Sequence, residues 1–267
     1  MNDRLQETNR AWGKYFSNAA DVRRLTWTPF LCYILLYGHF ALCLLAWLPF
    51  WTFCLSAPIL VVRWLLSLHE LLHLRSESEV DPITRLLPLM LTPQSLGYRE
   101  FLKVHQGHHR YMATPDDPEY FQLRGSKLHG LFNAMTAPEQ SFFRWLRRCG
   151  VDTELAIGAL LRCALFVLLL TLSSGAFLWY WIPVRLSFGA SYFAFFYALH
   201  RRGTEYGVYR ITLPVWARRL FSLLFGREAL LATLYHDIHH AQPRIGALHL
   251  HEVAQVWDLP QTGLPVK

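Results

Sequence analysis

Eight of the thirteen histidines in this 267-residue chain fall into three tight clusters. The first cluster has the spacing His-x-x-x-His, and the second and third both have the spacing His-x-x-His-His. On an α-helix, residues three or four positions apart share one face, with their Cβ atoms about 5–6 Å apart. Each cluster therefore directs two or three imidazoles towards one point, as metal coordination requires. The members are His69 and His73; His105, His108 and His109; and His236, His239 and His240.

These spacings are unlike a chance arrangement. At this histidine content, one His-x-x-His-His run is expected by accident in about three such chains per hundred, and two in well under one per thousand. The set therefore predicts a metal site. Imidazole nitrogen suits iron, zinc, copper and nickel alike, so the ligand type leaves the metal open. Glu70 and Asp237, inside the first and third clusters, either orient a ligand imidazole or face water.

The rest of the chain indicates that these clusters sit at the ends of membrane-spanning helices. The sequence is 53% hydrophobic, more than a soluble domain of this size needs. Its two long apolar regions, 28–74 and 155–199, are each long enough for two helices of about 20 residues, the length that crosses the hydrocarbon core. We expect breaks at Pro49 and Pro58 in the first region, and at 173–175 and Pro183 in the second. The expected fold is all-α, with four transmembrane helices in two hairpins.

The chain is expected to form a single membrane domain over residues 1–267. Lys and Arg number five in the N-terminal arm, ten in the central polar segment and eight in the C-terminal segment, and none lies in the two short outer turns. By the positive-inside rule, all three polar segments and both termini face the cytoplasm, where a helical cap holds the metal site. We expect a multi-pass protein of a bacterial inner membrane. Its parts are the arm 1–27, the first hairpin 28–74, the segment 75–154 with the second cluster, the second hairpin 155–199, and the segment 200–267 with the third cluster.

Several polar features within or near the apolar regions have two interpretations. Arg63 and Arg162 are expected to extend towards the cytoplasmic surface, whereas Arg185 lies mid-span, where an arginine costs about 2.5–3.5 kcal/mol. The segment 213–235 is amphipathic and lies either on the inner leaflet or on a cytosolic cap. His39 is either a functional intramembrane group or a helix contact. Three further histidines are expected to be solvated, the last two close enough to the third cluster to support it: His129, His249 and His251.

The order of the three clusters, the apolar regions between them and their cytoplasmic placement resemble the membrane fatty acid desaturase superfamily, which includes acyl-lipid desaturases and carotenoid ketolases. The resemblance covers about residues 30–250. It implies a non-haem centre of two iron ions held by the eight clustered histidines, with O₂ as co-substrate. Members supply one more histidine from the end of the last span. His200 occupies that place, although it could instead cap the helix at the interface.

The stretch 109–121 resembles the family's turn of Asp, Pro, an acidic residue and an aromatic residue after the second cluster. This resemblance makes Asp116 or Asp117 a partner that orients a ligand imidazole. The alternative is an ordinary Pro-Asp turn. No catalytic residue beyond the metal ligands is expected.

The activity that the resemblance implies is O₂-dependent desaturation of a fatty acyl chain with two external electrons. Hydroxylation or ketolation of a lipid, carotenoid or carrier-bound chain is the alternative. The first cluster has three intervening residues where many acyl-CoA desaturases have four, and the Asn-Tyr-x-Glu-His-Tyr-Gly signature of alkane hydroxylases is absent. With no fused haem or ferredoxin domain, electrons are expected from a separate ferredoxin- or cytochrome-type donor.

The net charge of +7 also bears on partners. Its basic residues are spread along the chain, which argues against nucleic acid and fits an acidic electron carrier, an acyl carrier protein or membrane lipids. Two other functions remain open. His69, Glu70 and His73 match the His-Glu-x-x-His motif of zinc proteases, which would leave the other clusters unused. A membrane metal carrier would need ligands along the bilayer path, whereas these histidines gather on one side.

Overall fold

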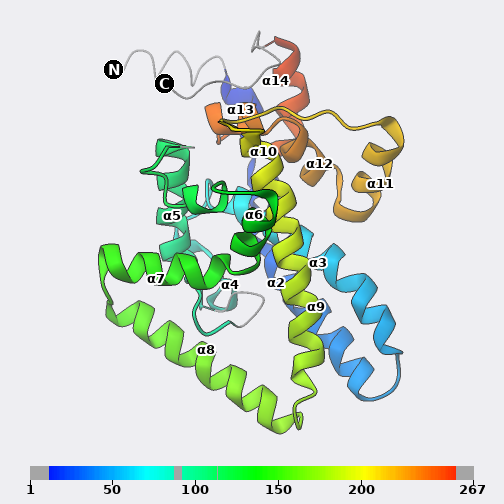
Figure 1. Cartoon of the computed structure of the whole chain (residues 1–267). Coiled ribbons are helices and arrows are strands. Elements are labelled where there is room, and N and C mark those ends of the chain that lie inside the picture. Colours follow the sequence, from blue (N-terminus) through cyan, green and yellow to red (C-terminus); the bar gives the residue numbers. More distant parts are fainter. Residues whose placement is uncertain (1–11, 87–91, 113, 257–267) are drawn as a thin grey trace.

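The computed structural model describes residues 12–86, 92–112 and 114–256, and these parts of the chain are mostly helical. Figure 1 shows the arrangement. The helices are α2 (Ala19–Leu44), α3 (Phe50–Leu71), α4 (Pro82–Leu86), α5 (Tyr98–Tyr111), α6 (Lys127–Met135), α7 (Ala137–Cys149), α8 (Thr153–Leu172), α9 (Phe177–Tyr192), α10 (Ala198–His200), α11 (Val215–Phe225), α12 (Arg227–Leu234), α13 (His236–Ala241) and α14 (Leu250–Val256). The other regular elements of the described residues are short 3₁₀ turns, a π-helical turn at Phe193–Tyr197, and the antiparallel strands β1 (Arg201–Arg202) and β2 (Glu205–Tyr206).

Four helices are long and apolar enough to cross a membrane, which confirms the four predicted spans. They are Ala19–Leu44, Phe50–Leu71, Thr153–Leu172 and Phe177–His200. The first begins well before residue 28, where the apolar region was expected to start. The Asn18 side chain accepts hydrogen bonds from the backbone N–H groups of Ala20 and Asp21, and the Asp21 carboxylate accepts one from the Asn18 backbone N–H, so a capping box starts the helix early. The predicted arm 1–27 is therefore partly helical, and its first eleven residues lie outside the described chain.

The expected breaks are only partly right. Pro49 does precede α3, and the chain turns at 173–175, where Ser174 and Gly175 have φ values of 51° and 87°. Pro58 and Pro183, however, lie inside α3 and α9 without ending them. Proline removes one backbone hydrogen bond, but membrane-spanning helices tolerate this loss because the neighbouring structure satisfies the freed group.

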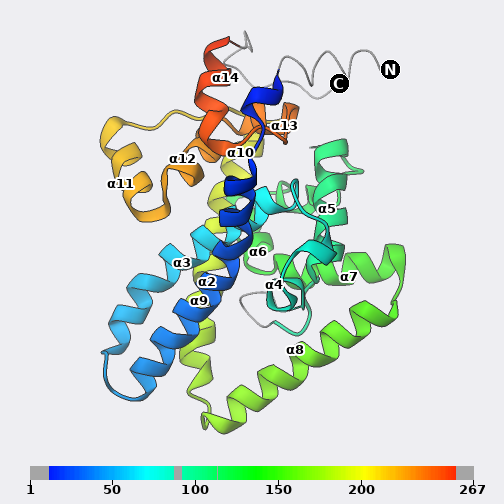
Figure 2. The same cartoon turned by 180° about the vertical axis from the view of Figure 1, so that it is seen from behind.

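The first two spans form a tight antiparallel pair, whereas the last two diverge. Figures 1 and 2 show α2 beside α3, α9 packed across α3, and α8 leaning away from the other spans. Stacked rings fill the centre of the α2–α3–α9 bundle, with the ring centroids of Tyr37 and Tyr180 4.6 Å apart. The helices α10, α12, α13 and α14 gather at one end of the spans and form a cap (Figure 1).

His39 ties α2 to α3. Its Nε2 lies 2.8 Å from the Thr52 hydroxyl and its Nδ1 lies 2.9 Å from the Ser56 hydroxyl, both on α3. A neutral imidazole has one donor and one acceptor nitrogen, so both are satisfied within the bilayer region. Of the two interpretations of His39, the structure shows the helix contact.

The arginines inside the spans bind other segments of the protein. Arg162 is 1% exposed and donates to the backbone carbonyl of Ser95 at 2.6 Å, so the expectation that its side chain extends to the surface is wrong. Arg185 pairs with Glu139 of α7 at 2.6 Å, which offsets the cost of a charge placed mid-span. Arg63 donates to the carbonyl of Leu224 at the end of α11. These contacts attach three parts of the protein to the spans: the segment that follows α4, the helix α7 and the helix α11.

The amphipathic segment 213–235 is two helices. Gly226, with a φ of 97°, separates α11 from α12. Most of α12 is buried, whereas α11 exposes an apolar face. The prediction that this surface lies on the inner leaflet or on a cytosolic cap therefore concerns α11 alone, whose exposed apolar residues are Val215, Trp216, Leu220 and Leu223.

Replacing Arg162 with leucine is expected to lower the stability of the folded protein by about 1–3 kcal/mol, because the buried Ser95 carbonyl would lose its hydrogen-bond donor. Thermal unfolding of the purified protein in detergent measures the change. Leu160→Ala on the same helix is the control, since Leu160 is 70% exposed and its loss should leave the unfolding temperature nearly unchanged. Equal unfolding temperatures for the two variants would contradict the structural role given to Arg162.

Candidate metal centre

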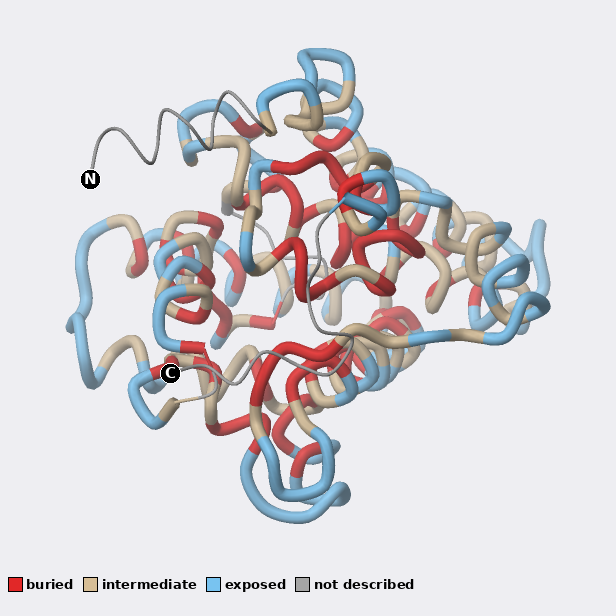
Figure 3. The backbone as a smooth tube through the Cα atoms, turned by 90° about the horizontal axis from the view of Figure 1, so that it is seen from above, coloured by how far each residue is buried: buried red, intermediate tan, exposed pale blue. Residues whose placement is uncertain are grey.

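All nine predicted histidine ligands meet at the junction of the spans and the cap. Viewed onto the cap, the inner turns are buried and the outer loops are exposed (Figure 3). The end of α3 and the turn after it carry His69 and His73, α5 carries the second cluster, α10 carries His200, and α13 carries the third cluster. Segments far apart in the sequence therefore bring their imidazoles together.

The imidazoles form two groups. In the first, ring nitrogens from five histidines lie within 4.8 Å of one another. The Nε2 atoms of His73 and His105 are only 2.9 Å apart. The members of this group are His69, His73, His105, His109 and His239.

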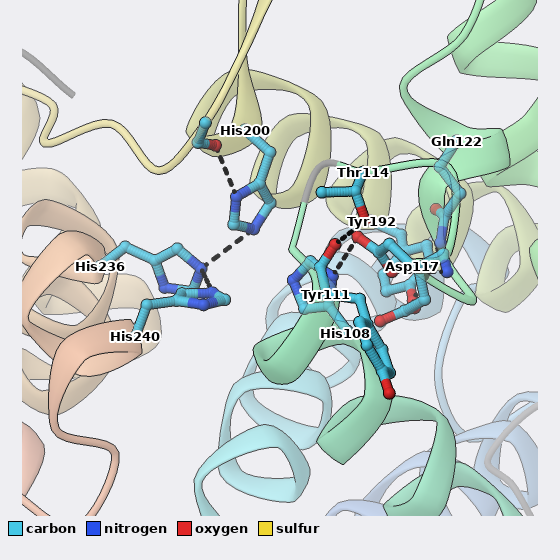
Figure 4. A network of polar contacts seen from close by, with 11 residues as sticks. His108, Tyr111, Thr114, Asp117, Gln122, Tyr192, His200, His236 and His240 are labelled. Atoms are coloured by element: carbon cyan, nitrogen blue, oxygen red, sulfur yellow. Dashed lines mark hydrogen bonds and ion pairs between the residues drawn. The ribbon is translucent and has the colours of Figure 1, made fainter. Parts of the chain in front are cut away.

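The second group lies beside the first. His108, His200 and His240 have ring nitrogens within 4.8 Å of one another. His236 completes the group, since its Nε2 lies 3.2 Å from that of His200 and 3.0 Å from that of His240 (Figure 4). The two groups touch where the rings of His109 and His240 stack, with centroids 4.0 Å apart.

The spacing His-x-x-His-His explains how one helix serves both groups. His105 and His109 are four residues apart and enter the first group, whereas His108 enters the second. On α13 the roles are exchanged: His239 joins the first group, and the pair four residues apart, His236 and His240, joins the second. Adjacent residues on a helix point about 100° apart, so a His-His pair cannot serve one centre. The expectation that each cluster directs two or three imidazoles towards one point therefore holds for two histidines in the second and third clusters, and the remaining histidine of each enters the other group.

The donor atoms fit a pair of metal ions. Among the described residues, both ring nitrogens of His109 and the Nε2 of His239 are buried atoms that lack a hydrogen-bond partner. A buried polar atom without a partner costs about 1–3 kcal/mol, and metal coordination would remove that cost. Converging imidazole nitrogens from four segments are a donor set that suits iron or zinc. Five histidines would hold one ion and four the other.

Three acceptors fix the orientation of ligand rings. Asp117 accepts a hydrogen bond from His108 Nδ1 at 2.9 Å (Figure 4). The carbonyl of Gly207 accepts one from His200 Nδ1 at 3.1 Å, because the β1–β2 hairpin turns the chain back onto α10. Each contact holds the proton on Nδ1 and leaves Nε2 free to bind a metal. Glu70 Oε1 lies 3.2 Å from His69 Nδ1 and also faces His239 Nδ1 at 3.5 Å.

Sequence reasoning named two of these three acceptors. Glu70 and Asp117 lie where a supporting carboxylate was predicted, but the backbone carbonyl of Gly207 was missed, because a main-chain acceptor leaves no mark in the sequence. Asp116 is exposed. Asp237 instead pairs with Arg210, with Oδ2 2.7 Å from Nη2, and so fastens α13 to the segment after β2.

The remaining histidines have other surroundings. His251 Nδ1 lies 2.7 Å from the Tyr235 hydroxyl, and His249 lies 3.8 Å from Glu252. His129 is exposed on α6. None of these three belongs to either histidine group among the described residues.

Burial keeps most of the clustered imidazoles that lie outside the spans neutral. Desolvation, followed by the neighbouring His69 and His108, lowers the pKa of His73 to about 3. Desolvation likewise moves the pKa of His105, His109, His236, His239 and His240 below the usual range. For His108, burial is the largest single influence and acts to lower the pKa, but the charge and hydrogen bond of Asp117 and the charge of Glu119 together raise it. The lowered values preserve the neutral form that binds metal.

A small cavity lies against the two groups and adjoins a larger pocket. The small cavity is lined by His69, His105, His108, His200 and His236, together with Glu119 and the apolar or aromatic residues Leu65, Phe101, Tyr192, Phe195 and Phe196. Leu65, Phe101 and Tyr192 also line the larger, mainly apolar pocket between α3, α5, α7 and α9, whose empty volume is about 660 Å³. These three side chains therefore lie between the pocket and the cavity that the histidines line.

The fold and the site together define a helical protein with four membrane-length spans and a paired histidine centre at one end. A family model described as fatty acid desaturase matches residues 45–266, which is most of the chain. The chain therefore belongs to the fatty acid desaturase family. No curated protein and no solved structure gives a match.

The paired geometry predicts that the purified protein binds two metal ions per chain. His239→Ala should lose at least the ion of the first group, because it removes one of the five imidazoles that would hold that ion. Inductively coupled plasma mass spectrometry measures the content. The matched control is His129→Ala, which removes an exposed imidazole and should leave the content unchanged. Equal metal loss in both variants would contradict the assignment.

The metal-free protein should become less stable as the pH falls from about 6.5 towards 3. The unfolded chain takes up protons near pH 6.5, whereas the folded chain resists because its histidine pKa values are lowered, as for His73. Stability is therefore full above pH 6.5 and falls by up to about 1.4 kcal/mol per pH unit for each such histidine. Denaturant unfolding in chelator between pH 7.5 and 5 measures the slope. His73→Phe should reduce this slope by up to about 1.4 kcal/mol per pH unit, the contribution of one proton. An unchanged slope would refute the account.

Proposed function

We propose that this protein is an O₂-dependent fatty acyl desaturase of a bacterial inner membrane, with both termini in the cytoplasm. The observation that carries the proposal is the side-by-side pair of histidine groups next to an apolar pocket. Membership of the fatty acid desaturase family supports the same conclusion. Desaturation of an acyl chain is the outcome we favour, and hydroxylation or ketolation of a lipid, carotenoid or carrier-bound chain is the alternative.

The nine histidines would hold two iron ions as resident cofactors. When bound, the iron pair supplies the redox chemistry with O₂ that breaking an unactivated methylene C–H bond requires, because acid–base groups cannot do so. The chain itself orients the ligands. Asp117 and the Gly207 carbonyl hold Nδ1 protons on His108 and His200, and Glu70 faces the Nδ1 atoms of His69 and His239. Restrained rings keep the ligand atoms in place without reorganisation during the reaction.

The apolar pocket suits a hydrocarbon chain. Trp64 and Leu68 of α3, Phe101 of α5 and Phe188 of α9 contribute to its lining. These helices include two of the spans, so a chain that lies among lipids can reach the pocket without crossing water. Burying the chain also keeps water from the reacting carbon.

Electrons are expected from the opposite side of the centre. His73, His109 and His240 are only partly buried and do not line the small cavity. Arg110 is exposed directly after His109. We propose that an acidic ferredoxin- or cytochrome-type donor docks on this side, since complementary charge accelerates such encounters. An acidic acyl carrier protein could use the same charge to deliver a substrate.

Lipid mass spectrometry of cells that express the wild-type protein tests the function. We expect a lipid species with one additional double bond, two mass units lighter than its precursor, which should fall below detection with His239→Ala because that variant breaks the first histidine group. His129→Ala is the control and should retain the product.

Other outcomes identify the alternatives. An oxygen-containing lipid in place of the alkene would show hydroxylation or ketolation by the same centre. Stoichiometric zinc without any O₂-dependent product would favour a hydrolytic role for His69, Glu70 and His73. Cellular metal uptake without a lipid product would favour a carrier. Each of these results would overturn desaturation as the function.

A further inference from the structure

Tyr192 stands between the apolar pocket and the cavity that faces the histidines. It lines both spaces, together with Leu65 and Phe101. Unlike those two, Tyr192 carries a hydroxyl group, and this hydroxyl is hydrogen-bonded to other side chains. A chain that enters the pocket and reaches the histidines must pass this ring.

The ring belongs to an aromatic row along one side of α9 and the π-helical turn that follows. The rings of Phe188 and Tyr192 lie 5.2 Å apart, those of Tyr192 and Phe196 5.8 Å, and those of Phe196 and His200 4.9 Å. Successive members are four residues apart, so their side chains are neighbours. Phe188 lines the pocket and His200 belongs to the second histidine group. The row of rings therefore extends from the pocket to the histidines.

The Tyr192 hydroxyl is fixed by the turn after the second histidine cluster. It donates a hydrogen bond to Glu119, which is 2% exposed, and Gln122 Nε2 lies 3.3 Å from the hydroxyl and 3.2 Å from the Glu119 carboxyl. Asn133 Nδ2 in turn donates to the carbonyl of Phe121 at 2.8 Å and so holds the turn itself. Two partners for one hydroxyl prevent the ring from swinging aside.

The same turn also orients a ligand. The Glu119 backbone N–H donates to Asp117 Oδ1 at 2.8 Å, while Asp117 Oδ2 accepts from His108 (Figure 4). One short segment therefore holds both a ligand imidazole and the ring that a substrate must pass. Their relative position is set by a few covalent bonds and buried hydrogen bonds, which makes it rigid.

We propose that Tyr192, clamped by Glu119 and Gln122, determines which carbon of an unbranched acyl chain is placed at the metal centre. This inference rests on the proposed function. The ring limits how far a chain slides from the pocket into the cavity, so it fixes the distance between the chain's end and the reacting carbon. Tyr192 is a specificity-determining residue, and Glu119 and Gln122 are positioning residues.

The first experiment compares double-bond positions in lipids from cells that express the wild type, four test variants and one control variant. Tyr192→Ala removes the ring, and we expect products displaced by one or more carbons to increase about tenfold, the discrimination that one methylene provides in an apolar pocket. Tyr192→Phe and Glu119→Ala keep the ring but lose the clamp, and should yield mixtures of positional isomers. Glu119→Gln retains a hydrogen-bond acceptor for the Tyr192 hydroxyl and should keep the double bond at the wild-type position. Tyr180→Phe, a buried tyrosine of α9 that lines neither space, is the control.

Active Tyr192→Ala enzyme with the wild-type bond position would overturn the inference and leave the proposed function intact. If Tyr192→Ala does not fold, the milder variants Tyr192→Phe and Glu119→Ala decide, and unaltered positions in both would overturn it. Altered positions in the Tyr180→Phe control would also overturn it, because any loss of a buried hydroxyl would then have the same effect.

A second experiment does not require turnover. Purified wild-type protein and Tyr192→Ala are photolabelled with a stearic acid that carries a mid-chain diazirine, and the labelled peptides are mapped. We expect the wild type to be labelled mainly in the pocket around Ser141 and Tyr192→Ala to gain label at Phe195 and Phe196 in the cavity. Identical labelling would overturn the inference. If labelling shifts while the wild type forms no oxidised lipid, the proposed function fails, but the place of Tyr192 as the limit between pocket and cavity stands.

Discussion

The convergence of nine imidazoles in a buried volume is the constraint on which the rest of the structure depends. Neutral histidines tolerate burial only if their nitrogen atoms are hydrogen-bonded or coordinated, and this requirement fixes the approach of α3, α5, α10 and α13. The His-His pairs on α5 and α13 give each of these helices a ligand in both groups. Because the two helices supply complementary members, a shift of either one would disturb both groups at once.

The spans supply the rigidity that such a centre needs, and their own polar groups contribute. His39 joins α2 to α3, while Arg162 and Arg185 hold the segment after α4 and the helix α7 against the last two spans. The pocket lies between these same segments. The intramembrane arginines therefore serve the shape of the pocket, and the turn from Asp117 to Gln122 links that pocket to the ligands.

Most of the fold was predictable because the bilayer demands long apolar helices with internally satisfied backbones. The four spans, the turn at 173–175 and the eight clustered histidines follow from composition and spacing, whereas His200 was expected only from the family resemblance. The errors have local causes. The capping box at Asn18 starts the first span early, Gly226 divides the amphipathic segment, and Pro58 remains inside α3. Long apolar patterns outweigh a single proline, whereas a glycine with positive φ ends a helix.

Only the tertiary structure decided how the histidines are divided, because spacing shows which side chains share a helix face but not which face meets which partner. It likewise showed that Asp117 orients His108 while Asp237 pairs with Arg210, and that a backbone carbonyl orients His200. The place of Tyr192 between pocket and cavity depends on contacts with residues seventy or more positions away. The sequence by itself determined the spans and the eight clustered donors, since both depend on local periodicity, and the family resemblance added His200. The pairing of the donors, their supports and the path to them arise from long-range packing, which local periodicity does not encode.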